Sequence, residues 1–196
     1  TDIEKAHAIY EWVVDNTFRD PKVIGCGWGD IKTMLETRYF GGKCGDLNAL
    51  FVGLARSVGV AARDIYGVRV APSQLGYKSL GLGSANASKG QHCRAEFFAQ
   101  GIGWVPVDPA DVRKVVLEEP PGNLQINDPK VVAMRKKLFG AWEMNWLAYN
   151  TAHDVVLPHS QTKIAYFMYP NGETGGKALN QLDPDSFRYT LTARQY

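Results

Sequence analysis

Three residues of this chain have the types and the order needed for covalent chemistry at a carbonyl carbon: Cys44, His92 and Asp108. A cysteine thiolate is a strong nucleophile, and an imidazole can accept its proton and later return a proton to a leaving amine. A carboxylate beside the imidazole fixes its tautomer and stabilises its charged form. Together the three residues predict acyl transfer through a thioester, provided that the fold brings them into contact.

Cys44 begins the strongest helical pattern in the chain, directly after Gly41-Gly42-Lys43. A helix N-terminus stabilises a thiolate and offers free backbone N–H groups to an oxyanion. The apolar stripe of this helix begins only at Leu47, so we expect Cys44 to be exposed at the helix mouth rather than buried in the core. Gly59 stands where a C-terminal helix cap belongs. The stripe consists of Leu47, Leu50, Phe51, Leu54 and Val58.

His92 and Asp108 lie in two predicted strands, 91–99 and 103–108, joined by a turn that begins at Gln100. The midpoint between positions 92 and 108 is 100, which places the two residues opposite each other to within about one residue. The predicted hairpin therefore positions a carboxylate against an imidazole.

The oxyanion formed in such a reaction needs hydrogen-bond donors. The backbone N–H of Cys44 is the first candidate. A second donor could come from the side chain of Trp28 or Tyr39, although ordinary aromatic packing is the alternative for both residues.

Several segments resemble the transglutaminase-like superfamily. They are 41–51 around Cys44, 55–63 with Gly67, His92 with Glu96, and 103–109 ending in Asp108-Pro109. The resemblance covers 41–112 and implies a papain-like cysteine fold, in which the nucleophile helix packs against an antiparallel β-sheet, and an acyl-enzyme thioester. Members include protein crosslinkers, peptide and amide hydrolases, and bacterial proteins of unassigned substrate, many of them exported. Arg94 departs from the family, which often has an aromatic residue two positions after the histidine.

The remaining pattern predicts helices first and then mainly antiparallel strands, so the expected class is α+β. We expect a single domain over 1–196, with 113–196 either part of the catalytic domain or an extension of it. The glycine- and serine-rich segment 72–90 is either a lid or a plain surface loop. Further helices are predicted over 1–16, after Asp30 and over 129–142, and further strands over 62–70, 144–149, 163–169 and 187–193.

The composition is that of an ordinary folded domain. The 196 residues are 45% hydrophobic and 21% charged, with a formal net charge of +2, which does not point to a nucleic-acid partner. No run of 18 apolar residues predicts a membrane span. The chain does not begin with Met, and the resemblance leaves open an exported, periplasmic protein whose signal has been removed.

The three cysteines, Cys26, Cys44 and Cys93, form no Cys-x-x-Cys pair, so we expect no metal and no cofactor. Cys93 alternates with His92 along its strand, and we expect it in the core. A Cys26–Cys93 disulfide would suit an exported protein. A metal or redox site built from the three cysteines and His92 is an alternative that matches no known ligand spacing.

The sequence thus predicts a cysteine-dependent enzyme acting on a protein or peptide substrate, at a Gln side chain or another amide bond. Hydrolysis is slightly favoured over protein crosslinking, because the chain has no obvious acidic cluster for an amine acceptor. A transglutaminase-like scaffold that only binds a partner is the alternative, and the retention of all three catalytic residue types disfavours it.

Overall fold

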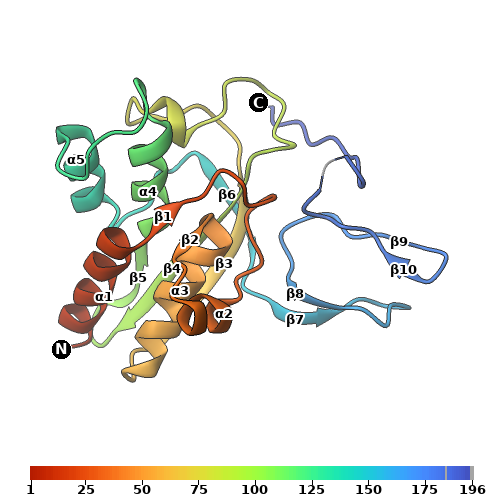
Figure 1. Ribbon diagram of the computed structural model, residues 1–196, viewed down its shortest axis with the longest axis horizontal. Coiled ribbons are helices and arrows are strands. Elements are labelled where there is room, and N and C mark those ends of the chain that lie inside the picture. The colour runs from red at the N-terminus through yellow and green to blue at the C-terminus, as the bar shows by residue number, and fades with distance from the viewer. Residues whose placement is uncertain (184, 195–196) are drawn as a thin grey trace.

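A four-stranded antiparallel sheet forms the centre of the molecule. In the computed structural model, which describes residues 1–183 and 185–194, the strand order is β5 (Gly103–Val107), β4 (Gln91–Ala99), β3 (Ala62–Arg69) and β6 (Trp146–Asn150). Helices precede and flank this sheet (Figure 1). The mixture of helices with antiparallel strands confirms the α+β class.

The helix α3 (Cys44–Ser57) packs against β4 and β3, and α1 (Asp2–Asn16) packs beside it. The first part of the predicted stripe on α3 points inward, since Leu47, Leu50 and Phe51 are fully buried. Leu54 is half-buried, and the prediction is wrong for Val58, which follows the end of α3 and is 45% exposed. Phe51 meets Phe97 of β4 with ring centroids 6.5 Å apart. Burial of this stripe fixes which face of α3 is turned to the sheet, and hence where its first residue lies.

The helix boundaries follow the predicted capping signals. Thr1 and Glu4 form a capping box at the start of α1, and Asp30 caps α2 (Ile31–Thr37) through the N–H of Thr33. Gly59 follows α3 with φ of 83°, the left-handed conformation that favours glycine. Two short parallel strands, β1 (Phe18–Arg19) and β2 (Gly41–Gly42), lead the chain into α3.

The connection after Asp108 differs from the prediction, which gave no element there. Residues Pro109–Glu118 form α4, and the Asp108 side chain caps it by accepting a hydrogen bond from the N–H of Asp111 at 3.0 Å. The same Asp-Pro signal opens α5 (Pro129–Lys137). Proline at the first helical position loses no hydrogen bond there. The prediction for α5 was right at its start and too long at its end.

The C-terminal part forms small hairpins that extend away from the sheet on the side opposite the N-terminus (Figure 1). They are β7 (His153–Val156) with β8 (Lys163–Tyr166), and β9 (Glu173–Thr174) with β10 (Lys177–Ala178). The predicted strand over 187–193 is wrong, since Thr192 makes only an isolated bridge to Asn86. The segment 72–90 contains a short 3-10 helix, η1 (Lys78–Leu80).

None of the helices in the described part of the chain combines the length and the apolar character needed to cross a membrane.

Candidate active site

Cys44 is the first residue of α3, as predicted, but the expectation that it is exposed is wrong. Its exposed fraction is 4%. The preceding loop covers it, because the N–H of Gly45 donates to the carbonyl of Cys26 at 2.7 Å. The thiol is therefore covered, while α3 still provides the N-terminal position that favours a thiolate.

His92 and Asp108 are in contact, though not by the predicted register. Strands β4 and β5 pair Ala95 with Val107, so the residue opposite Asp108 is Arg94. His92 precedes Arg94 by two residues. The predicted direct opposition is therefore wrong. Contact arises because Asp108 ends the strand and turns into α4, which brings its Oδ2 to 2.7 Å from Nε2 of His92. Both residues are buried.

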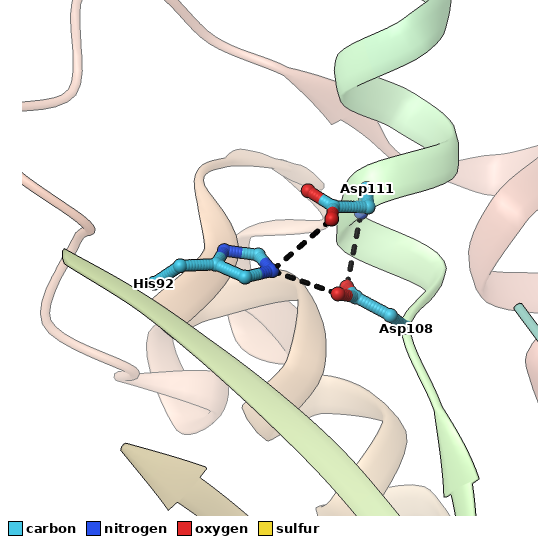
Figure 2. A group of neighbouring side chains, drawn as sticks. All are labelled: His92, Asp108 and Asp111. Atoms are coloured by element: carbon cyan, nitrogen blue, oxygen red, sulfur yellow. Dashed lines mark hydrogen bonds and ion pairs between the residues drawn. The ribbon is translucent and has the colours of Figure 1, made fainter. Parts of the chain in front are cut away.

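A second carboxylate, which the sequence analysis did not identify, also faces His92. Asp111, one turn into α4, places Oδ2 3.4 Å from the same Nε2 atom (Figure 2). Asp111 pairs with Arg69 of β3, and Asp108 lies 3.4 Å from Nε of Arg94. The Asp108-Pro-Ala-Asp111 spacing could have identified Asp111 from the sequence. A helix-capping residue and the third residue of the helix lie on the same side of the helix start.

This environment favours the charged imidazolium. Burial and the nearby Arg69 oppose the charge, but Asp111 and Asp108 outweigh them and raise the pKa of His92 to about 9. Burial and the neighbouring Asp111 raise the pKa of Asp108, whereas Arg69 and His92 overcome burial and hold the pKa of Asp111 well below its usual value. The carboxylate pair thus keeps negative charge beside the imidazole.

The three cysteines lie together. Burial raises the pKa of Cys44, but the neighbouring thiols of Cys26 and Cys93 and the charge of His92 more than reverse this and leave the pKa well below its ordinary value. The neighbouring Cys44 together with burial raises the pKa of Cys26, and burial raises that of Cys93. These directions favour Cys44 as the thiol of the three that ionises.

The other two cysteines are free thiols, so the suggested Cys26–Cys93 disulfide is absent. Cys93 is fully buried in the core, which confirms that prediction. The Cys26 thiol donates to the carbonyl of Gln91 at 3.2 Å.

A cleft of about 350 Å³ opens over Cys44 and His92. One wall comes from the segment 81–90, which includes Lys89. Another comes from the C-terminal part of the chain, through Tyr169, Leu182 and Tyr189. Residues beyond 113 carry no family motif, yet they shape the surroundings of the nucleophile.

Neither predicted second oxyanion donor lines this cleft. Trp28 is 58% exposed and borders a different pocket beside the C-terminal hairpins. The hydroxyl of Tyr39 donates to Asp20 at 2.8 Å. In the described part of the chain the N–H of Cys44 has no acceptor, whereas that of Gly45 is taken by Cys26.

Asn48 is a further polar residue of the site. It lies one turn after Cys44 on α3 and is fully buried. Its side-chain amide donates to the carbonyl of Cys93 at 2.8 Å and to Oδ1 of Asp108 at 3.3 Å. Asn48 therefore ties α3 to β4 and to the start of α4.

Arg94, the departure from the family pattern, is 1% exposed. Its guanidinium carbon lies 4.8 Å from the ring centroid of Trp146, and its Nη1 donates to the carbonyl of Glu143 at 2.6 Å. Arg94 thus supports Asp108 from within the protein interior, and it does not line the cleft.

The donor atoms of His92, Asp108 and Asp111 lie within 4.8 Å of one another, close enough to hold a metal ion. Each carboxylate, however, already faces an arginine. Two guanidinium groups supply the compensating charge that a cation would otherwise bring, so the arrangement fits a buried ion-pair network better than a chelating site.

Comparison with known proteins places these features in a family. Residues 1–109 match the family model described as the transglutaminase-like superfamily, a stretch that contains Cys44, His92 and Asp108. An uncharacterized protein of Haemophilus influenzae is 44% identical over 204 residues, covering 98% of this chain and 54% of the relative. This chain thus spans about half the length of that relative. No solved structure matches. Since the family model covers more than half of the sequence, the chain belongs to the transglutaminase-like superfamily.

Proposed function

We propose that this protein catalyses cysteine-dependent acyl transfer on carboxamide or peptide bonds through a thioester. The observation that carries the proposal is the buried hydrogen bond of 2.7 Å between His92 and Asp108, beside a thiol at the N-terminus of α3. Because Nε2 of His92 is held by Asp108, its Nδ1 is the atom left for Cys44. The shifted pKa values of Cys44 and His92 both favour a thiolate–imidazolium pair.

The reaction follows from this pair. The Cys44 thiolate attacks the carbonyl carbon, and the developing oxyanion accepts a hydrogen bond from the Cys44 N–H. The His92 imidazolium gives its proton to the departing nitrogen, the C–N bond breaks, and a thioester remains. Neutral His92 then takes a proton from the incoming nucleophile, which attacks the thioester and releases Cys44 as thiolate.

Water is the proposed nucleophile for the second step. No Asp or Glu in the described part of the chain lines the cleft. A lysine side chain approaching as acceptor would therefore meet no carboxylate there. Hydrolysis of an amide or peptide bond is accordingly favoured over protein crosslinking.

We further propose a papain-like arrangement within one domain spanning 1–196. The nucleophile helix α3 packs on the sheet that carries His92, in keeping with that arrangement. The C-terminal segment contributes Tyr169 and Leu182 to the same cleft, which supports a single functional unit.

The test is the pH dependence of Cys44 alkylation by iodoacetamide in wild type and in His92→Ala. A free thiol reacts only as the pH approaches about 8.5, whereas a histidine-paired thiolate reacts several units lower. Since the pKa of Cys44 is lowered and that of His92 is raised to about 9, we expect rapid labelling of wild type at pH 6. We also expect turnover to decline above about pH 9, when the imidazolium loses the proton that the leaving group needs.

Peptide mass analysis would identify Cys44 as the labelled thiol. His92→Ala should move the labelling curve toward the free-thiol range, and Cys44→Ala should abolish turnover of any amide substrate. Labelling that rises only near pH 8–9 and ignores His92 would instead favour the binding-scaffold alternative.

A further inference from the structure

The cleft over Cys44 is lined by positive charge only. Five basic side chains border it: Arg19, Lys43, Arg69, Lys89 and Lys114. Within residues 1–183 and 185–194, no carboxylate lines it. For a chain whose formal net charge is +2, this is a strong local concentration of one sign.

Three of the five cations are partly neutralised from behind the cleft wall. Arg69 pairs with Asp111, while Arg19 and Lys114 share a single carboxylate, that of Glu118. These three cations face only two carboxylates, so one positive charge among them is left uncompensated.

Lys43 and Lys89 lie in no ion pair within the described ranges of the chain, and both line the cleft together with Cys44. Lys43 immediately precedes Cys44 in the chain. Lys89 lies just before β4, the strand that carries His92. The thiolate of Cys44 and the imidazolium of His92 cancel each other, so they do not neutralise the lysines. A cleft with walls of one sign concentrates a ligand of the opposite sign.

Resting on the proposed function, we infer that the substrate is an anionic acyl donor: a peptide or amide with a free carboxylate within a residue or two of the scissile carbonyl. Lys43 and Lys89 would bind this carboxylate. Either an acidic side chain or a C-terminal carboxylate supplies the same chemistry. A substrate with a lysine at that place would be repelled.

Two alkylating reagents test the charge of the cleft without a known substrate. Iodoacetate and iodoacetamide react alike, since the thiolate forms an S–C bond as iodide leaves, but only iodoacetate is anionic. The measured quantity is the iodoacetate-to-iodoacetamide rate ratio for Cys44 at pH 6, compared with the ratio for N-acetylcysteinamide. We expect the ratio for Cys44 to be higher, and to fall toward the reference value as salt is added.

Lys43→Gln and Lys89→Gln should each lower this ratio by roughly threefold, as expected for one unit charge near the reacting atom in largely aqueous surroundings, and the double variant by about tenfold. Lys136→Gln is the matched control, because it removes an exposed lysine of α5 that does not line the cleft. Its ratio should equal that of wild type.

Short peptides then distinguish the two sources of the carboxylate through protection of Cys44 from iodoacetamide. Protection by a Glu-containing peptide over its Gln counterpart indicates an acidic side chain, and protection by a free C-terminus over its amide indicates a terminal carboxylate. Equal protection by acidic and neutral peptides, or a wild-type ratio equal to that of the free thiol, overturns the inference while leaving a reactive Cys44. A Cys44 that neither reagent labels at pH 6 defeats the proposed function, and this inference with it.

Discussion

At the residue scale, two carboxylates and two arginines surround one imidazole. Asp108 and Asp111 both approach Nε2 of His92, and each also faces a guanidinium group. Buried ions are tolerated only when paired, and removing one partner leaves the other charge uncompensated. The two carboxylates nevertheless make different contacts. Asp108 makes the shorter one with His92, and Asp111 makes the closer one with an arginine.

This difference predicts separable effects of two matched substitutions. Asp108→Asn preserves the cap of α4, since asparagine caps well, but it removes the charge that orients His92, so turnover should fall by roughly a hundredfold or more. Asp111→Asn leaves the buried Arg69 without its counter-charge and should cost about 3–5 kcal/mol of unfolding free energy. Turnover of an amide substrate would measure the first effect, and urea denaturation of both variants would measure the second. Equal loss of stability in both variants would contradict the division of roles.

At the element scale, the start of α3 depends on a close backbone approach. A Cβ at Gly45 would lie 2.6 Å from the carbonyl oxygen of Cys26, and backbone cannot move aside as a side chain can. A Cβ at Gly53, in the same helix, would meet the side chain of Ile31, whose Cδ1 would lie at 2.3 Å. Glycine is therefore required at position 45, where the loop backbone packs against the helix. At position 53 the neighbouring atoms belong to a flexible side chain that can move aside.

Gly45→Ala should therefore destabilise the protein, although alanine favours helix by about 1 kcal/mol over glycine in a helix interior. It should also slow Cys44 alkylation at pH 6, because the added methyl group meets the carbonyl oxygen of Cys26 and shifts the first turn of α3, and with it the N-terminal position that favours the thiolate. Gly53→Ala is the matched control. We expect its stability to stay within about 1 kcal/mol of wild type and its alkylation rate to be unchanged. Thermal unfolding measures the stability, and a time course of alkylation measures the labelling rate. A wild-type labelling rate in Gly45→Ala would contradict the argument.

At the scale of the whole molecule, the C-terminal hairpins hold the loop that covers Cys44. Tyr166 of β8 stacks on Tyr66 of β3 with ring centroids 5.0 Å apart, and its buried hydroxyl donates to the carbonyl of Gly27. Leu182 packs against Gly25 of the same loop. The C-terminal segment thus sets the position of residues that neighbour the nucleophile far earlier in the chain.

Tyr166→Phe should cost about 1–3 kcal/mol, because the carbonyl of Gly27 loses its buried partner. The loosened loop should also let larger alkylating reagents reach Cys44 faster, relative to iodoacetamide. Tyr149→Phe, at a position that is 44% exposed, is the control and should change neither quantity. An unchanged reagent-size dependence in Tyr166→Phe would show that the hairpins do not control access.

Local signals in the sequence were sufficient for much of the catalytic frame. The stripe from Leu47 predicted α3 and placed Cys44 at its start. The strands at 91–99 and 103–108 were also predicted, the second one residue longer than observed. Asp30 marked the start of α2, and Gly59 marked the end of α3. Each of these depends on contacts between residues close in sequence, so periodicity and capping chemistry suffice. The Asp-Pro signal at 108–109 was equally local, and α4 was predictable from it.

Other features depended on segments that are distant in sequence. Cys44 is buried because the loop at Cys26 folds over it, and this loop is in turn contacted by the C-terminal segment through Tyr166. No property of the helix alone reports that cover. The ion-pair network around His92 joins β3, β4 and α4, and the basic cleft assembles residues from position 19 to position 114. The sequence by itself determined the proposed reacting groups and the helix and strands that present them. The tertiary structure alone decided their burial, their charge environment and the walls of the cleft, because these arise from packing between elements and not from the pattern within any one of them.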